Sequence, residues 1–158
     1  MDREDLLRRL NWFYSLEINQ VELYKVQSNQ FKDHYAGKVF ERVAEIEQGH
    51  VENIEKRILA MGGTPTALGE VISPIIGMSL GSLMSLTGLE RALQLNAEIE
   101  RKAMSDYKKL VEDLVSSGED PDGETCILLK SNFIDEHLHT AFFDMLRGNL
   151  MEDKIEGI

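Results

Sequence analysis

Apolar residues recur at alternating steps of three and four along four long stretches of the chain: roughly residues 4–33, 36–61, 88–117 and 124–150. This spacing gathers the apolar side chains on one face and predicts four amphipathic helices. Gly62, Gly63 and Pro65 predict the end of the second helix, and Gly118 with Pro121 predicts the end of the third.

The connections between these helices differ in length. A short turn near His34–Gly37 joins the first two, and the polar turn 118–124 joins the last two. Short connections predict two antiparallel hairpins. Residues 62–87 form a long crossover between helices 2 and 3. We therefore expect an all-α antiparallel four-helix bundle, as a single domain over residues 1–158.

The crossover is unusually apolar, with no charged residue from Val71 to Leu89. That length is close to what a membrane span requires. Pro74, four serines and three glycines dilute its apolarity, however. We expect a short helix packed on the bundle or on a partner subunit. The alternative is an apolar lip, residues 71–87, that dips into a membrane surface.

The buried face of every helix, which we call its seam, turns polar near its middle. The four seams are Leu10, Phe13, Glu17, Gln20, Tyr24, Gln27, Phe31; Phe40, Val43, Glu47, His50, Ile54, Met61; Leu89, Leu93, Asn96, Glu100, Ala103, Tyr107, Leu110, Leu114; and Leu129, Asn132, Glu136, His139, Phe143, Leu146, Leu150. An unpaired buried carboxylate costs several kcal/mol, and four at one level repel one another. Something positive is therefore expected among them.

The spacing of the polar seam residues indicates what that is. Glu47-x-x-His50 and Glu136-x-x-His139 each place a carboxylate and an imidazole one turn apart on the same face. Adding Glu17 and Glu100 gives the pattern of di-iron and di-manganese bundles. Four carboxylates balance two divalent ions, and oxygen and imidazole ligands suit Fe, Mn or Zn. We predict two metal ions, with iron as the expected metal and Mn or Zn as substitutes.

Other polar residues near these positions each have more than one interpretation. Tyr24 and Tyr107 each follow a seam glutamate by seven residues. The simpler interpretation is that they are core aromatic residues with a satisfied hydroxyl; the alternative is a catalytic role, either beside the metal ligands or as a radical. Asp135 flanks a ligand and either points away or orients a ligand. Glu98 is a rival to Glu100, but it leaves the apolar series.

Composition limits the function and the location. The net charge of −11 argues against nucleic-acid binding, because phosphates are repelled. Cys126 is the only cysteine, which excludes a thiolate cluster and an internal disulfide. The charged start, MDREDLLRRL, lacks the apolar core of a secretory signal. A cytoplasmic protein is the simplest expectation, with membrane association through residues 71–87 as the open alternative.

With these motifs in place, the chain resembles the ferritin-like di-iron carboxylate superfamily over nearly its whole length. The segment EIEQGHVENIEKRILAMGGTP is similar to the second helix of bacterioferritins and rubrerythrins. The segment from Pro65 to Glu100 resembles demethoxyubiquinone hydroxylases, in which it lies near the membrane and the quinone. The resemblance implies a ferritin-like bundle with metal ligands Glu17, Glu47, His50, Glu100, Glu136 and His139.

Departures from these families narrow the function. Gln48 stands where bacterioferritins have a haem-ligating methionine, and Ala103 stands where rubrerythrins have an extra glutamate. The leading expectation is a di-iron oxidoreductase that activates O₂ or peroxide and hydroxylates a hydrophobic, quinone-like substrate, with an external electron donor. The alternatives are a ferritin-like ferroxidase for iron storage or detoxification and a rubrerythrin-like peroxidase. A homo-oligomer, as a dimer, is expected because the apolar crossover favours a partner.

Overall fold

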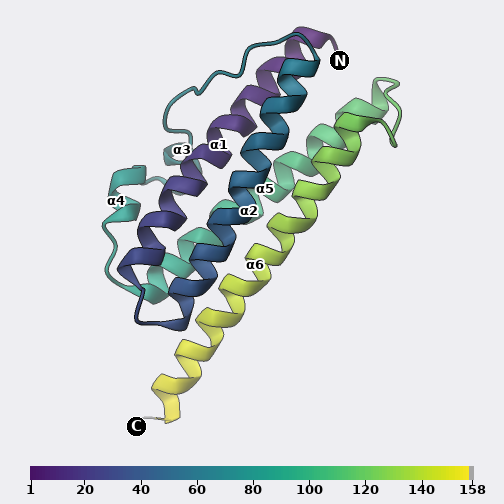
Figure 1. The fold of residues 1–158 in the computed structure, drawn as a ribbon. Helices are drawn as coiled ribbons and strands as arrows, with labels where there is room; N and C mark the ends of the chain where they lie inside the picture. Colours follow the sequence, from purple (N-terminus) through teal and green to yellow (C-terminus); the bar gives the residue numbers. More distant parts are fainter. Residues whose placement is uncertain (157–158) are drawn as a thin grey trace.

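The chain folds into two long helical hairpins that lie side by side (Figure 1). The structure, a computed structural model, describes the backbone of residues 1–156 and the side chains of residues 1–151. Helices α1 (Arg3–Gln30) and α2 (Tyr35–Ala60) form the first hairpin, and α5 (Leu89–Ser116) and α6 (Glu124–Glu156) form the second. The predicted all-α four-helix bundle, with a crossover between the second and third long helices, is confirmed.

The ends of the long helices follow from local sequence. The Asp2 side chain caps α1 by accepting a hydrogen bond from the backbone N–H of Asp5. After α2, Gly62 has a φ of +70° and its neighbour Gly63 donates to the carbonyl of Ile58. Gly118 ends α5 in the same way, with a φ of +94°. Glycine tolerates this left-handed backbone at no steric cost, so both helices stop where the sequence predicts.

Three predicted boundaries are wrong by a few residues. Helix α1 ends at Gln30, because Phe31–His34 already form the turn, so the turn comes earlier than His34–Gly37. Residue 37 lies inside α2, and a Cβ there would be 2.4 Å from the carbonyl oxygen of Phe31, which explains the glycine. Helix α6 continues past residue 150 to Glu156 and extends beyond the other helices (Figure 1).

The crossover contains two short helices rather than the single one expected: α3 (Ser73–Ile76) and α4 (Leu80–Met84). Helix α4 packs on α1, and α3 packs on α5. Ile72, Leu80 and Leu83 are buried against the bundle, which explains the lack of charge in this segment. Within residues 1–156, the helices are too short or too polar to cross a bilayer.

Polar side chains on α1 fix the path of the crossover. Asn11, Ser15 and Asn19 are spaced one turn apart and accept hydrogen bonds from backbone N–H groups at Thr66 (2.6 Å), Leu68 (2.8 Å) and Val71 (2.8 Å). Asn19 also donates to the carbonyl of Gly69 at 3.3 Å. An irregular segment packed on a helix needs such partners, because it cannot satisfy its own backbone groups.

We expect Asn19→Ala to lower the free energy of unfolding by about 1 to 3 kcal/mol, because the backbone N–H of Val71 loses its acceptor in a partly buried position. Urea unfolding of the metal-free protein measures this change. The matched control is Asn29→Ala, since Asn29 is exposed and bonds only to its own helix at Lys25. Equal losses in the two variants would show that Asn19 does not hold the crossover.

Candidate metal centre

The polar middles of the four seams meet inside the bundle. Glu17 on α1, Glu47 on α2, Glu100 on α5 and Glu136 on α6 are each 0% exposed. Above and below them most seam residues are buried, and they are apolar apart from four amides: Gln20, Gln27, Asn96 and Asn132. The residues of the predicted seams that are only half-buried lie at their ends: Phe31, Met61, Leu89 and Leu150. The periodicity of the sequence therefore placed the interior faces of all four helices correctly.

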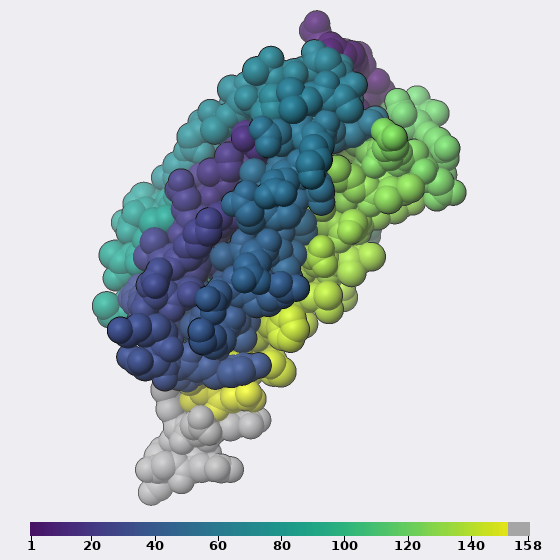
Figure 2. Space-filling model, in the orientation of Figure 1, coloured from purple at the N-terminus to yellow at the C-terminus, as the bar shows by residue number. Residues whose placement is uncertain are grey.

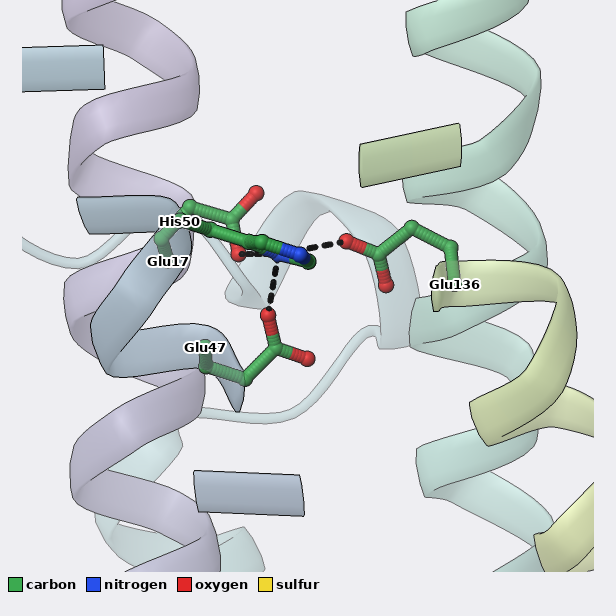
Figure 3. Close-up of side chains that lie close together, drawn as sticks. All are labelled: Glu17, Glu47, His50 and Glu136. Atoms are coloured by element: carbon green, nitrogen blue, oxygen red, sulfur yellow. Dashed lines mark ion pairs between the residues drawn. The ribbon is translucent and has the colours of Figure 1, made fainter. Parts of the chain in front are cut away.

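Two ligand sets share this interior. Glu17, Glu47, His50 and Glu136 offer one atom each within 4.8 Å of one another, and Figure 3 shows these four side chains pointing toward a common centre. Glu47, Glu100, Glu136 and His139 form a second set within the same limit. Glu47 and Glu136 belong to both. Each metal position therefore has the two shared carboxylates, one imidazole and one carboxylate of its own. We call the latter, Glu17 or Glu100, the terminal carboxylate. This is the donor set of a carboxylate-bridged metal pair.

Both imidazoles present Nδ1 to the carboxylates. His50 Nδ1 lies 2.8 Å from Glu47, 3.5 Å from Glu136 and 3.6 Å from Glu17. His139 Nδ1 lies 3.0 Å from Glu47 and 3.7 Å from both Glu100 and Glu136. Each nitrogen is thus close to three carboxylates, which is the arrangement expected of ligands converging on a cation.

Many of these atoms have no hydrogen-bond partner. Within residues 1–151 no hydrogen bond is made by a set of buried atoms that includes both carboxylate oxygens of Glu47 and of Glu136, Oε2 of Glu17, and Nδ1 of His50 and of His139; several of these atoms lie only within ion-pair distance of one another. Buried polar atoms without partners are rare, and each demands an explanation. Oxygen and imidazole nitrogen are ligands for Fe, Mn and Zn, so a pair of these ions fits the residues present.

The pKa values in the metal-free protein show that burying these carboxylates together is electrostatically unfavourable. Burial, followed by repulsion from Glu47, raises the pKa of Glu17 to about 8. Burial and the nearby Glu47 and Glu100 also raise the pKa of Glu136 well above its usual range. Burial opposes ionisation of Glu47 as well, but His139 and His50 outweigh it and lower the pKa of that carboxyl. The cluster thus retains protons that bound cations would displace.

The histidines complete this pattern. Burial lowers the pKa of each imidazole, but the surrounding carboxylates reverse the effect, and both pKa values are raised. For His50 the leading partner is Asp135, and for His139 it is Glu100. Metal-free protein therefore favours protonated imidazoles, whereas ligation requires a free Nδ1.

We expect the metal-free protein to lose stability as pH rises from about 5 to 8. Glu17, Glu136, His50 and His139 have folded-state pKa values above their unfolded values, so the folded protein holds more protons than the unfolded chain in this range. Their contributions are complete below the unfolded pKa values and are lost as pH rises. Glu47 has a lowered pKa and acts in the opposite sense, but only below its ordinary value of 4.5.

Thermal melts of chelator-treated protein across this range test the prediction. Metal-loaded protein should instead gain stability with pH, because ligation requires deprotonated carboxylates and imidazoles. A metal-free melting temperature that rises from pH 5 to pH 8 would contradict the buried cluster.

The two tyrosines lie against the terminal carboxylates, in a crossed arrangement. Tyr24 on α1 donates a hydrogen bond to Glu100 on α5, and Tyr107 on α5 donates to Glu17 on α1. Both tyrosines are 0% exposed. Burial and the adjacent glutamates raise both tyrosine pKa values, so the hydroxyls stay protonated and remain donors.

One neighbour of the ligands, Asp135, was predicted with two open roles, and the contacts of two others, Gln20 and Asn132, were not predicted from the sequence. Asp135 reaches His50, with Oδ2 at 3.1 Å from Nε2, so of the two roles open to it the orienting one fits the structure. Gln20 donates to Glu100 at 3.2 Å, and Asn132 donates to the hydroxyl of Tyr107 at 3.0 Å. Glu98 is exposed and bonds to Gln94, outside the cluster.

The chain matches a known family. The family model described as ubiquinone biosynthesis protein COQ7 matches residues 16–145, a range that contains all six candidate ligands. A search of curated proteins finds no match.

The fold also matches a solved structure, reported as a dodecameric thioferritin, the bacterioferritin-related protein from Bacteroides fragilis. The TM-score is 0.78, with 19% sequence identity, over 99% of this chain and 92% of the other. At that identity the likeness shows a shared ferritin-like helical bundle.

Proposed function

This chain belongs to the COQ7 ubiquinone biosynthesis family, and from that premise we propose that it is a di-iron oxidoreductase that uses O₂ to hydroxylate a hydrophobic, quinone-like substrate. One observation carries the proposal: two buried ligand sets that share Glu47 and Glu136. Glu17 and His50 would complete one metal position, and Glu100 and His139 the other. Balanced hydroxylation consumes the substrate, O₂, two electrons and two protons, and releases water, so an external reductant is required.

The protein's own residues hold and shield this centre. The bound iron pair would supply the redox chemistry toward O₂. Tyr24 and Tyr107 act as positioning residues, since each fixes one oxygen of a terminal glutamate by a hydrogen bond. Apolar neighbours such as Phe40 and Phe143, both 0% exposed, exclude water from the reacting region.

A groove on the α1–α5 side is the proposed substrate site. Its volume is about 630 Å³, and it is lined by apolar and charged side chains: Arg8, Arg9, Trp12, Phe13, Leu68, Lys102, Asp106, Lys109 and Leu110. The Phe13 ring stacks on Tyr107, with ring centroids 4.1 Å apart and an angle of 17°. Because Tyr107 in turn donates to Glu17, two stacked aromatic rings, those of Phe13 and Tyr107, lie between the groove and the carboxylates.

Anaerobic loading with Fe(II), followed by O₂ and a short-chain quinol analogue, tests the function. Oxygen uptake coupled to a hydroxylated product supports it. Iron binding without a hydroxylated product or oxygen uptake would contradict the proposal that the protein is an enzyme. Within the same assay, Trp12→Ala should raise the KM for the analogue and leave the iron content unchanged, because Trp12 lines the groove and touches no ligand. Tyr35→Ala, at a 68% exposed position outside the groove, is the control.

We also propose that the protein is a homodimer, though not for the reason first expected. The crossover buries or half-buries most of its large apolar side chains on its own bundle, whereas the outer face of α6 leaves large apolar residues exposed: Ile127, Ile134, Leu138, Phe142 and Met145. Several of them follow the heptad spacing of helix pairs. Light scattering distinguishes the outcomes: a dimer agrees with the proposal, a monomer contradicts it, and a large shell would favour iron storage.

A further inference from the structure

The two hairpins repeat the same ligand pattern, but they differ at the residue that precedes each shared glutamate. Glu47 and Glu136 occupy equivalent positions, as do His50 and His139. The residue before Glu136 is Asp135, and the residue before Glu47 is Ile46. A carboxylate on one side and an alkyl group on the other give the two imidazoles different surroundings.

His50 has a partner on its outer nitrogen. Its Nε2 lies 3.1 Å from Oδ2 of Asp135, which reaches across from α6 to α2. A carboxylate at this nitrogen fixes the tautomer, holds the ring in orientation and makes Nδ1 a stronger donor to a metal. Asp135 is partly exposed, with 34% of its side chain accessible.

His139 has none. Its Nε2 is buried without a hydrogen-bond partner among the side chains of residues 1–151, and the residue is 1% exposed. The side chain borders a recess of about 190 Å³ between α2 and α6, where Ile46, Val43 and Phe142 contribute apolar walls. These two helices lie next to each other along the face shown in Figure 2. Ile46 thus lines the space next to His139, where a counterpart of Asp135 would be expected.

The terminal glutamates, Glu17 and Glu100, also differ in the number of hydrogen bonds that they accept. Both oxygens of Glu100 accept hydrogen bonds, one from Tyr24 and one from Gln20. Among the residues whose side chains the structure describes, Glu17 accepts a hydrogen bond from Tyr107 alone; its Oε2 accepts none, although it lies 3.6 Å from His50 Nδ1. The residue equivalent to Gln20 on α5 is Ala103, which has no donor to offer. Each oxygen of Glu100 thus has one lone pair left for a metal, whereas Oε2 of Glu17 has both of its lone pairs available.

From these differences we infer that the two metal positions are inequivalent: the Glu17–His50 position binds a divalent ion more tightly and fills first, and Asp135 is the positioning residue responsible. This inference rests on the proposed two-metal centre. It is independent of the substrate, since it concerns only metal affinity.

Anaerobic calorimetric titration of metal-free protein with Co(II) at fixed pH measures the two affinities. Wild type should bind in two steps that differ by tenfold or more. Asp135→Asn should weaken the tight step by about 10- to 100-fold, which is typical for loss of such a partner. Ile46→Asp should strengthen the weak step by about tenfold, with Ile46→Asn as the uncharged control. A crystal with one equivalent of Co(II) should show its anomalous peak beside His50.

Each alternative result is decisive. Two equal steps in wild type, a first peak beside His139, or equal weakening of both steps in Asp135→Asn would overturn the inference while leaving the metal pair intact. No Co(II) binding at all would overturn the proposed function together with the inference. Circular dichroism of each variant checks that its helical fold is retained.

Discussion

Glu136→Gln is expected to lower the affinity for both metal ions by more than about a hundredfold. Glu136 belongs to both ligand sets, so losing its charge affects both positions at once. Loss of an outer hydrogen-bond partner alone typically costs 10- to 100-fold, and a bridging ligand matters more. The substitution preserves side-chain volume, so the core remains filled. Metal content after reconstitution and desalting measures the effect.

The matched control is Glu98→Gln. Glu98 is exposed and lies outside the cluster, although it is only two residues from Glu100. The Glu98→Gln variant should bind two metal ions with unchanged affinity. If Glu136→Gln also retained both ions, Glu136 could not be a shared ligand.

Removing the metal should lower the melting temperature by about 10 °C or more. A single ion present at a thousand times its dissociation constant stabilises the folded state by about 4 kcal/mol. For a chain of this size, each kcal/mol shifts the melting temperature by about 2–4 °C. Calorimetry with and without a chelator measures the difference. The physical cause is that bound ions give the buried carboxylates cationic partners, whereas the metal-free cluster has to retain protons on buried groups instead.

Glu136→Gln serves as the internal control for this experiment. With its metal binding impaired, its melting temperature should no longer respond to chelator. An identical melting temperature for wild-type protein with and without chelator would mean that no ion contributes to the fold.

The sequence was most informative where burial and charge conflict. Glu17, Glu47, Glu100 and Glu136 stand in apolar series whose period fixes the inner face of each helix, and all four are 0% exposed. A buried charge needs compensation whatever the details of packing. This is why the residues that meet at the centre could be named from spacing alone.

The partners of these residues were harder to predict. Asp135 lies off the seam of α6, and its contact with His50 on α2 depends on how the two helices are rotated against each other. The crossed pairing of Tyr24 with Glu100 likewise joins two helices that are distant in sequence. Spacing within one helix contains no information on such rotations, so the sequence indicated candidates without their partners.

The path of the crossover is a second feature that could not be predicted from the sequence. Its lack of charge predicted burial, and Ile72 and Leu83 are buried. Its path, however, is set by hydrogen bonds from its backbone to Asn11, Ser15 and Asn19. Backbone groups are the same at nearly every residue, so the sequence does not specify which of them will meet these side chains.

The most direct test is an anomalous-scattering map of crystals grown after anaerobic loading with Fe(II), with data on both sides of the iron edge. We predict two iron peaks in the bundle interior, both next to Glu47 and Glu136, one also next to His50 and the other next to His139. A map without iron at this centre, or with iron only at exposed acidic residues, would contradict the claim that these buried carboxylates exist to hold a metal pair.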